Sequence, residues 1–146
     1  MSHIIRFDEA GATDTRLVGG KAASLGRLVA IDVPVPFGFS VTTTAHSNFL
    51  AENALASSIH ALVRAIDFDD PQGLEKITGE IRNLIVDAPM PQDIATQIVD
   101  GYKALGEQAY VAVRSSGTAE DLADASFAGM YDTYLDIRGV DDVLDA

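Results

Sequence analysis

The 146-residue sequence contains no cysteine. The chain can therefore form neither a disulfide nor a thiolate metal site, and thiol redox chemistry is excluded. Absence of disulfides is typical of intracellular proteins, so we expect a cytoplasmic location. No apolar run approaches the roughly 20 residues that a membrane-spanning helix needs, and we expect no membrane partner. Residues 1–10 carry no apolar segment of the kind found in secretory signals.

Basic residues are also scarce. Lys and Arg number 10 against 22 Asp and Glu, which gives a formal net charge of -12. A negative field of this size repels the phosphates of nucleic acids, so we expect no nucleic-acid partner. Any site for a phosphorylated ligand must instead be made positive locally, by a few placed cations and by backbone N–H groups at helix starts. Each Lys or Arg beside a glycine-rich turn is therefore a candidate ligand contact.

Apolar residues, in contrast, are plentiful at 47% of the chain and are regularly spaced. This content is enough to bury the core of one domain, which we assign to residues 1–146. The spacing predicts an α/β (α+β) fold in which the apolar stripes of the helices form the core. Helices are predicted over residues 21–30, 44–50 (with Thr43 as the cap) and 57–66, from Pro71, from Pro91 to a stop at Gly106, and from Asp141.

Strand-like patterns are shorter. They occur at residues 4–7, 37–42 and 110–113, and in the alternation of Tyr131, Thr133, Leu135 and Ile137. The third is read as a buried strand, and with the fourth it would suit an antiparallel pair joined by a loop over residues 116–129. The helix that begins at Asp141 is cut off after about one turn, so we expect the chain to be a truncated fragment.

A first candidate segment covers residues 18–26. Gly19 and Gly20 precede a predicted helix, where backbone N–H groups can approach an anion, and Lys21 adds a full positive charge. A glycine turn followed by a solvated lysine is the commoner meaning of such a pattern, and both interpretations stay open on these residues alone.

A second candidate segment covers residues 113–122. Arg114 directly follows an apolar strand, from which its guanidinium could be aimed at phosphate oxygens. The small side chains of residues 115–118 leave room and donors for a polyanion. The alternative is structural: Arg114 pairs with a local carboxylate, and Thr118 with Asp121 forms a helix-capping box.

Together with the runs 33–39 and 125–129, these segments resemble the N-terminal nucleotide-binding region of the phosphoenolpyruvate synthase and pyruvate phosphate dikinase family. The resemblance covers residues 17–28, 33–50 and 111–139. It implies an ATP-grasp fold in which ATP lies between two lobes. This chain would be most of the first lobe, with helices and a small mixed or antiparallel sheet.

The resemblance also implies roles for single residues. Lys21 and Arg114 would contact the phosphates of ATP, with Arg114 as the catalytic candidate, and Gly129 and Thr133 would line the nucleotide site. Similar enzymes pass the β-phosphoryl group of ATP to a His on a separate swivelling domain or subunit, which carries it to a small-molecule acceptor such as pyruvate. Mg²⁺ is expected as a cofactor, with its acidic ligands outside this chain.

The phosphorylated His is not expected here, because His3, His46 and His60 all lack the Thr-rich and Gly-rich setting of that residue. The acceptor stays open, since Met130 and Tyr131 stand where phosphoenolpyruvate synthases usually have two Gln. Relatives that resemble this region also phosphorylate phenol or rifamycins. A nucleotide-binding module without turnover and a purely structural helical domain are the remaining alternatives.

Overall fold

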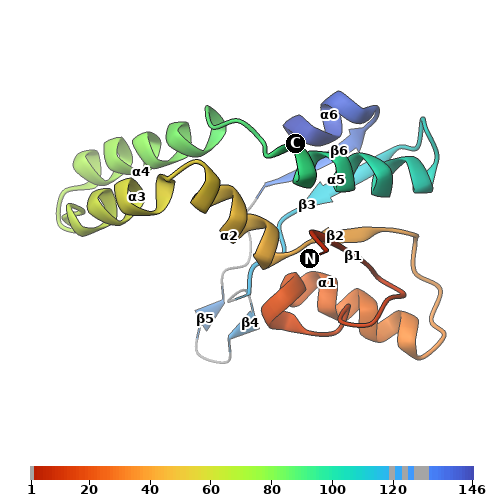
Figure 1. Cartoon of the computed structure of the whole chain (residues 1–146). Helices are drawn as coiled ribbons and strands as arrows, with labels where there is room; N and C mark the ends of the chain where they lie inside the picture. Colours follow the sequence, from red (N-terminus) through yellow and green to blue (C-terminus); the bar gives the residue numbers. More distant parts are fainter. Residues whose placement is uncertain (1, 119–120, 123–124, 127–131) are drawn as a thin grey trace. The chain divides into compact units, whose positions relative to one another are not determined.

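A computed structural model describes residues 2–118, 121–122, 125–126 and 132–146 (Figure 1). The chain divides into two compact units. The first unit comprises Met1–His46 with Gln92–Ala146, and the second comprises Ser47–Pro91. All the candidate site residues fall in the sequence of the first unit.

The helices and strands follow one another in a mixed order (Figure 1). They are β1 (Ile4–Arg6), α1 (Thr15–Ala30), β2 (Phe39–Val41), α2 (Thr43–Glu52), α3 (Leu55–Arg64), α4 (Pro71–Val86), α5 (Gln92–Leu105), β3 (Val111–Arg114), β4 (Asp121–Leu122), β5 (Ala125–Ser126), β6 (Thr133–Ile137) and α6 (Val140–Asp145). The predicted combination of helices with a small antiparallel sheet is confirmed.

The strands of the described residues pair two by two, and each pair is antiparallel: β1 with β2, β3 with β6, and β4 with β5. The predicted pairing of the third and fourth strand patterns is confirmed from Thr133 onwards, and Tyr131 lies outside the described residues. Two details were predicted wrongly. The paired strands β4 and β5 lie within the expected 116–129 loop, and β3 is not buried but alternates between half-buried and exposed positions, as successive side chains point to opposite faces.

Local signals explain where several helices begin and end. Asp70 accepts a hydrogen bond from the Gln72 N–H (3.2 Å) and Pro71 follows, as predicted for the start of α4. The helix α5 ends before Gly106, whose φ of 126° favours glycine. The start of α2 differs from prediction: the cap is Thr42, whose Oγ1 accepts from the Ala45 N–H (3.2 Å).

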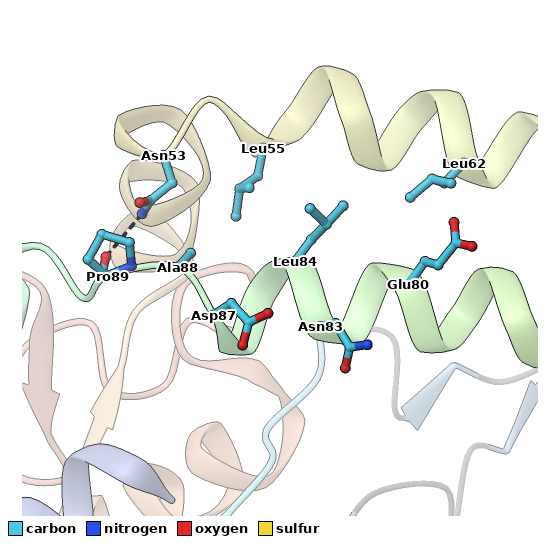
Figure 2. A pocket seen from close by; sticks show the side chains of 9 residues that line it. All are labelled: Asn53, Leu55, Leu62, Glu80, Asn83, Leu84, Asp87, Ala88 and Pro89. Carbon is cyan, nitrogen blue, oxygen red and sulfur yellow. Dashed lines mark hydrogen bonds between the residues drawn. The ribbon is translucent and has the colours of Figure 1, made fainter.

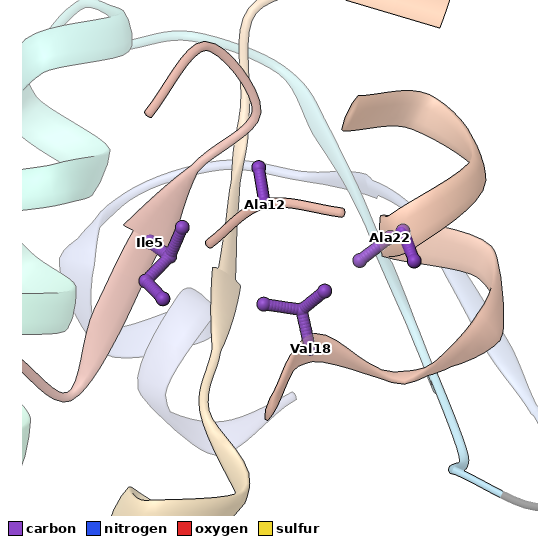
Figure 3. Packing of buried hydrophobic residues seen from close by; sticks show 5 residues of the cluster. Ile5, Ala12, Val18 and Ala22 are labelled. Carbon is purple, nitrogen blue, oxygen red and sulfur yellow. The ribbon is translucent and has the colours of Figure 1, made fainter. Parts of the chain in front are cut away.

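The core of the first unit is small and tight. Ile5 of β1 and the α1 residues Val18, Ala22 and Ala23 pack with Ala12, as Figure 3 shows for four of these five side chains. The predicted stripe of α5 contributes a further three buried residues, Ile94, Ile98 and Tyr102. In the second unit the predicted core is only partly formed, because α4 has no fully buried residue and α3 buries Leu55 alone.

His3 fastens β1 to α5, and its ring is buried, with 3% of the residue exposed. Its Nε2 lies 2.8 Å from Asp93 Oδ2, and its backbone N–H donates to Gln97 Oε1 at 2.7 Å. The hydrogen bond to His3 lowers the pKa of Asp93 below its ordinary value. His46 and His60 are exposed. The contacts of His3 thus hold β1 against α5.

Tyr102 joins three elements of the first unit through its hydroxyl group. The hydroxyl donates to the Ala109 carbonyl and accepts from the Gly139 N–H, each at 2.8 Å. Ala109 precedes β3 and Gly139 precedes α6, so one side chain of α5 fixes the starts of both elements. Tyr102 itself is 1% exposed.

Replacing Tyr102 by Phe tests this junction. We expect Tyr102→Phe to lower the free energy of unfolding by about 1 to 3 kcal/mol, because a carbonyl and an N–H lose their partner inside the protein. The matched control is Tyr110→Phe: Tyr110 is 67% exposed and its hydroxyl accepts only from exposed Arg138. That change should stay within about 0.5 kcal/mol. Equal losses in urea unfolding for both variants would contradict the assignment.

Candidate functional site

The helix α1 is broken at Gly19. This residue has φ 79° and ψ 173°, a backbone conformation that essentially only glycine adopts. Space adds a second restriction, because a Cβ atom placed on Gly19 would lie 1.7 Å from the carbonyl oxygen of Ser116. Glycine is thus required twice over at this position, once for its dihedral angles and once for its lack of a side chain.

The break brings the two candidate segments together. Beyond it, the Gly20 N–H donates to the Gly117 carbonyl (3.1 Å) and the Ala22 N–H donates to Ser116 Oγ (3.0 Å). Between them, Lys21 Nζ lies 3.5 Å from Ser115 Oγ. Residues 115–117, here called the docked loop, therefore lie against the start of the second part of α1.

These contacts correct one expectation. The N–H groups at the helix start were predicted to approach an anion, but those of Gly20 and Ala22 already have acceptors in the docked loop. The two glycines instead allow the backbone of the docked loop to lie close to α1. The Lys21 side chain, between Gly20 and Ala22 in sequence, brings a positive charge to these contacts.

Arg114 and Thr133 face one another across the β3–β6 pair, where they are opposite in register. Both residues are exposed. Arg114 directly precedes the docked loop, so the strand end that presents it is continuous with the segment that contacts Lys21. The structure thus brings three of the four predicted ATP-contacting residues into one region of the first unit.

Gly129 was predicted as the fourth such residue. It lies outside the described residues, as do Met130 and Tyr131. Its assignment therefore stays a prediction.

The structure tests one of the two structural alternatives for the second segment. The described residues show no ion pair between Arg114 and a carboxylate, but Glu120 and Asp124 lie outside them, so this pairing stays an open alternative. The capping box proposed for Thr118 and Asp121 is wrong, because Asp121 begins the strand β4 and no helix starts there. Arg16, in contrast, binds Asp14 at 3.0 Å, and the hydrogen bond from Arg16 lowers the pKa of Asp14.

The described residues offer no evident set of ligands for a divalent metal ion. No group of three or more His, Asp or Glu side chains there could hold a metal ion. The described residues do not fit a Mg²⁺ site by themselves, and we assign no step to the metal. Nor is any described helix of sufficient length and apolar character to cross a membrane.

A separate cavity of about 510 Å³ lies in the second unit (Figure 2). Leu55 and Leu62 of α3 face Leu84 of α4 across it. Asn53 closes one end with a hydrogen bond from its side-chain amide to the Pro89 carbonyl (3.2 Å). The lining includes none of the predicted site residues, so we do not place the chemistry there.

Two cations presented by a helix start and a strand end, with a serine-rich loop between them, are typical of a domain that binds phosphorylated ligands. A comparison with known families then identifies which one. The family model described as "Pyruvate phosphate dikinase, AMP/ATP-binding domain" matches residues 15–146, and the chain belongs to this family.

Curated relatives agree with this placement. The chain is similar to "Probable phosphoenolpyruvate synthase" of Methanothermobacter thermautotrophicus, with 40% identity over 99% of the chain and 22% of the relative. It is 41% identical to "Phosphoenolpyruvate synthase" of Pseudomonas aeruginosa over 100% of the chain and 19% of the relative. It is 44% identical to "Probable phosphoenolpyruvate synthase" of Archaeoglobus fulgidus over 97% of the chain and 19% of the relative. The chain thus spans about a fifth of these relatives.

The helix break gives a direct structural test. We expect Gly19→Ala to destabilise the first unit by at least about 1 to 3 kcal/mol from backbone strain alone, with the displacement of Ser116 adding to it. Gly79→Ala is the control, since a Cβ there meets nothing within 4 Å and Gly79 lies inside α4. That change should raise stability by about 0.5 to 1 kcal/mol. If urea unfolding shows the two variants shifted alike, the close approach at Gly19 is not as described.

Proposed function

We propose that this chain is the ATP-binding part of a dikinase-type phosphotransferase, as the first lobe of an ATP-grasp domain. The observation that carries the proposal is the meeting of Lys21 with the docked loop, next to the exposed Arg114. Family membership supports it, because the family is described as an AMP/ATP-binding domain. Charge supports it too: in a chain of net charge -12, an exposed Arg114 at a strand end and the half-buried Lys21 beside the docked loop suit a polyanionic ligand.

In this proposal the chain's own residues bind and orient the triphosphate. The Lys21 ammonium group neutralises phosphate charge, and the planar guanidinium of Arg114 binds two phosphate oxygens at once. Thr133 lies opposite Arg114 and lines the site with its hydroxyl, and Gly129 gives the nucleotide close access to the backbone. Such chemistry depends mainly on positioning and charge neutralisation. Mg²⁺, when bound through acidic ligands from elsewhere, would neutralise further phosphate charge.

The complete reaction involves parts beyond these residues. We propose that the β-phosphoryl group of ATP passes to a His on a swivelling domain or subunit and then to the acceptor, while water cleaves the bond to the γ-phosphate, leaving AMP and phosphate. The relatives' names favour pyruvate as the acceptor. We place the reaction in the cytoplasm, in keeping with a cysteine-free chain.

The decisive experiment incubates the full-length gene product with ATP, Mg²⁺ and pyruvate, and identifies the products. AMP, phosphate and phosphoenolpyruvate together support the proposal. AMP and phosphate formed only with phenol or a rifamycin would retain the dikinase chemistry and replace the acceptor. ADP as the sole nucleotide product, or binding of ATP without any turnover, would overturn it in favour of another kinase or a non-catalytic nucleotide-binding module.

Substitution of the two cations tests the residue assignments. In the full-length protein, we expect Lys21→Ala and Arg114→Ala each to weaken transition-state binding by about 1.5 to 3 kcal/mol, or about 10- to 150-fold in kcat/KM for ATP. Lys103→Ala is the control, because Lys103 is an exposed cation in the last turn of α5. Parental activity in both site variants, with fold verified by circular dichroism, would show that the site lies elsewhere.

The isolated 146-residue chain should bind ATP poorly. It offers cations from one lobe, and its described residues hold no metal-ligand cluster. Association also loses translational and rotational freedom worth about 4 kcal/mol or more. We therefore expect a Kd on the order of millimolar or weaker and no formation of AMP. Calorimetric titration with Mg-ATP measures this. Micromolar affinity, or any turnover, would mean that this chain holds a complete site.

A further inference from the structure

The break in α1 adds hydrogen-bond partners from outside the helix. In a continuous α-helix each N–H donates to the carbonyl four residues earlier, so the Arg16 and Val18 carbonyls would face the Gly20 and Ala22 N–H groups. In the structure both N–H groups donate to the docked loop. The two carbonyls lie directly before the break and also receive donors from other elements.

Two hydroxyl groups supply those donors. Thr43 Oγ1 donates to the Arg16 carbonyl at 2.9 Å, and Ser40 Oγ lies 3.2 Å from the Val18 carbonyl. Thr43 opens α2 and Ser40 lies in the middle of β2, so the donors come from outside α1. Both carbonyls that precede the break therefore accept from a side chain outside the helix.

Burial makes the second of these contacts the more consequential. Ser40 is 8% exposed and Val18 is 3% exposed, and an unpaired carbonyl in such surroundings is strongly unfavourable. The Ser40 hydroxyl has one proton and also lies 3.3 Å from the Val41 carbonyl. The contact with the Val18 carbonyl is buried, whereas the contact with the Val41 carbonyl is only partly buried. The Val18 carbonyl is therefore the one that is destabilised more when the Ser40 proton points to the other carbonyl.

We propose that Ser40 and Thr43 are positioning residues for the ATP site. Their hydroxyls stabilise the broken form of α1, in which the Gly20 and Ala22 N–H groups remain available to the docked loop. Without the hydroxyls, the two carbonyls are satisfied best by straightening the helix, which withdraws those N–H groups from Ser116 and Gly117. The docked loop, which contacts Lys21 and directly follows Arg114, then no longer holds the two cations in one place. The consequence for ATP rests on the proposed function, whereas the effect on the docked loop does not.

The first experiment measures amide hydrogen exchange in the 146-residue chain without ATP. We expect Thr43→Val, and more strongly Ser40→Ala, to speed exchange at Gly20 and Ala22 about tenfold beyond the change at the buried α5 amides. Thr43→Ser keeps the hydroxyl and should restore slow exchange. Thr96→Val is the matched control, because the Thr96 hydroxyl donates to the Gln92 carbonyl within one helix of the same unit. It should leave both amides unchanged.

The second experiment measures steady-state phosphorylation by the full-length protein. We expect Thr43→Val to raise KM for ATP about tenfold with a smaller change in kcat, and Thr43→Ser to restore it, because the hydroxyl positions phosphate-binding groups rather than reacting atoms.

The two readouts separate the possible failures. Unchanged exchange at Gly20 and Ala22 in both Thr43→Val and Ser40→Ala overturns the positioning role, whatever happens to activity. Faster exchange with a raised KM supports it in full. Faster amide exchange with an unchanged KM supports the role of the two hydroxyls at the break in α1. The same result overturns the placement of ATP beside the docked loop.

Discussion

The approach of the Ser116 carbonyl to the Cα of Gly19 is the constraint on which the candidate site depends. A side chain at position 19 would occupy the place of that carbonyl. Because the two backbones touch, α1 must break, the Gly20 and Ala22 N–H groups turn to the loop, and the preceding carbonyls turn to Ser40 and Thr43. Packing follows the same arrangement, since Val18 and Ala22, on either side of the break, belong to one buried cluster.

Local features of the fold were predictable because their causes are local. The start of α4 was evident from Asp70 and Pro71, since the cap and the ring act within one turn. The cap of α2 was placed one residue late. Thr42 and Thr43 have the same side chain, and only the tertiary contact of Thr43 with the Arg16 carbonyl separates their roles. Burial of β3 was overestimated because an apolar run does not reveal how many neighbours a strand has.

The candidate site was predictable in its residues and less so in its physical arrangement. Lys21 and Arg114 were identified from their neighbours, and the family resemblance gave them a common ligand. Contacts between Lys21 and Ser115 join positions 94 apart in sequence, a separation over which spacing carries no geometric information. An anion was therefore one candidate partner for the N–H groups after the glycines, and in the structure Ser116 and Gly117 accept from them.

The broken helix also has a consequence for the order of events during synthesis. Ala22 leaves the ribosome 94 residues before Ser116, its hydrogen-bond acceptor in the native fold. At typical elongation rates this interval lasts roughly 5 to 20 seconds, far longer than a helix takes to form. A nascent α1 has no loop to receive its N–H groups during that time, and bonding to its own carbonyls is the nearest way to satisfy them. The native break at Gly19 is thus completed late, when the second half of the first unit emerges and replaces helical partners with its own.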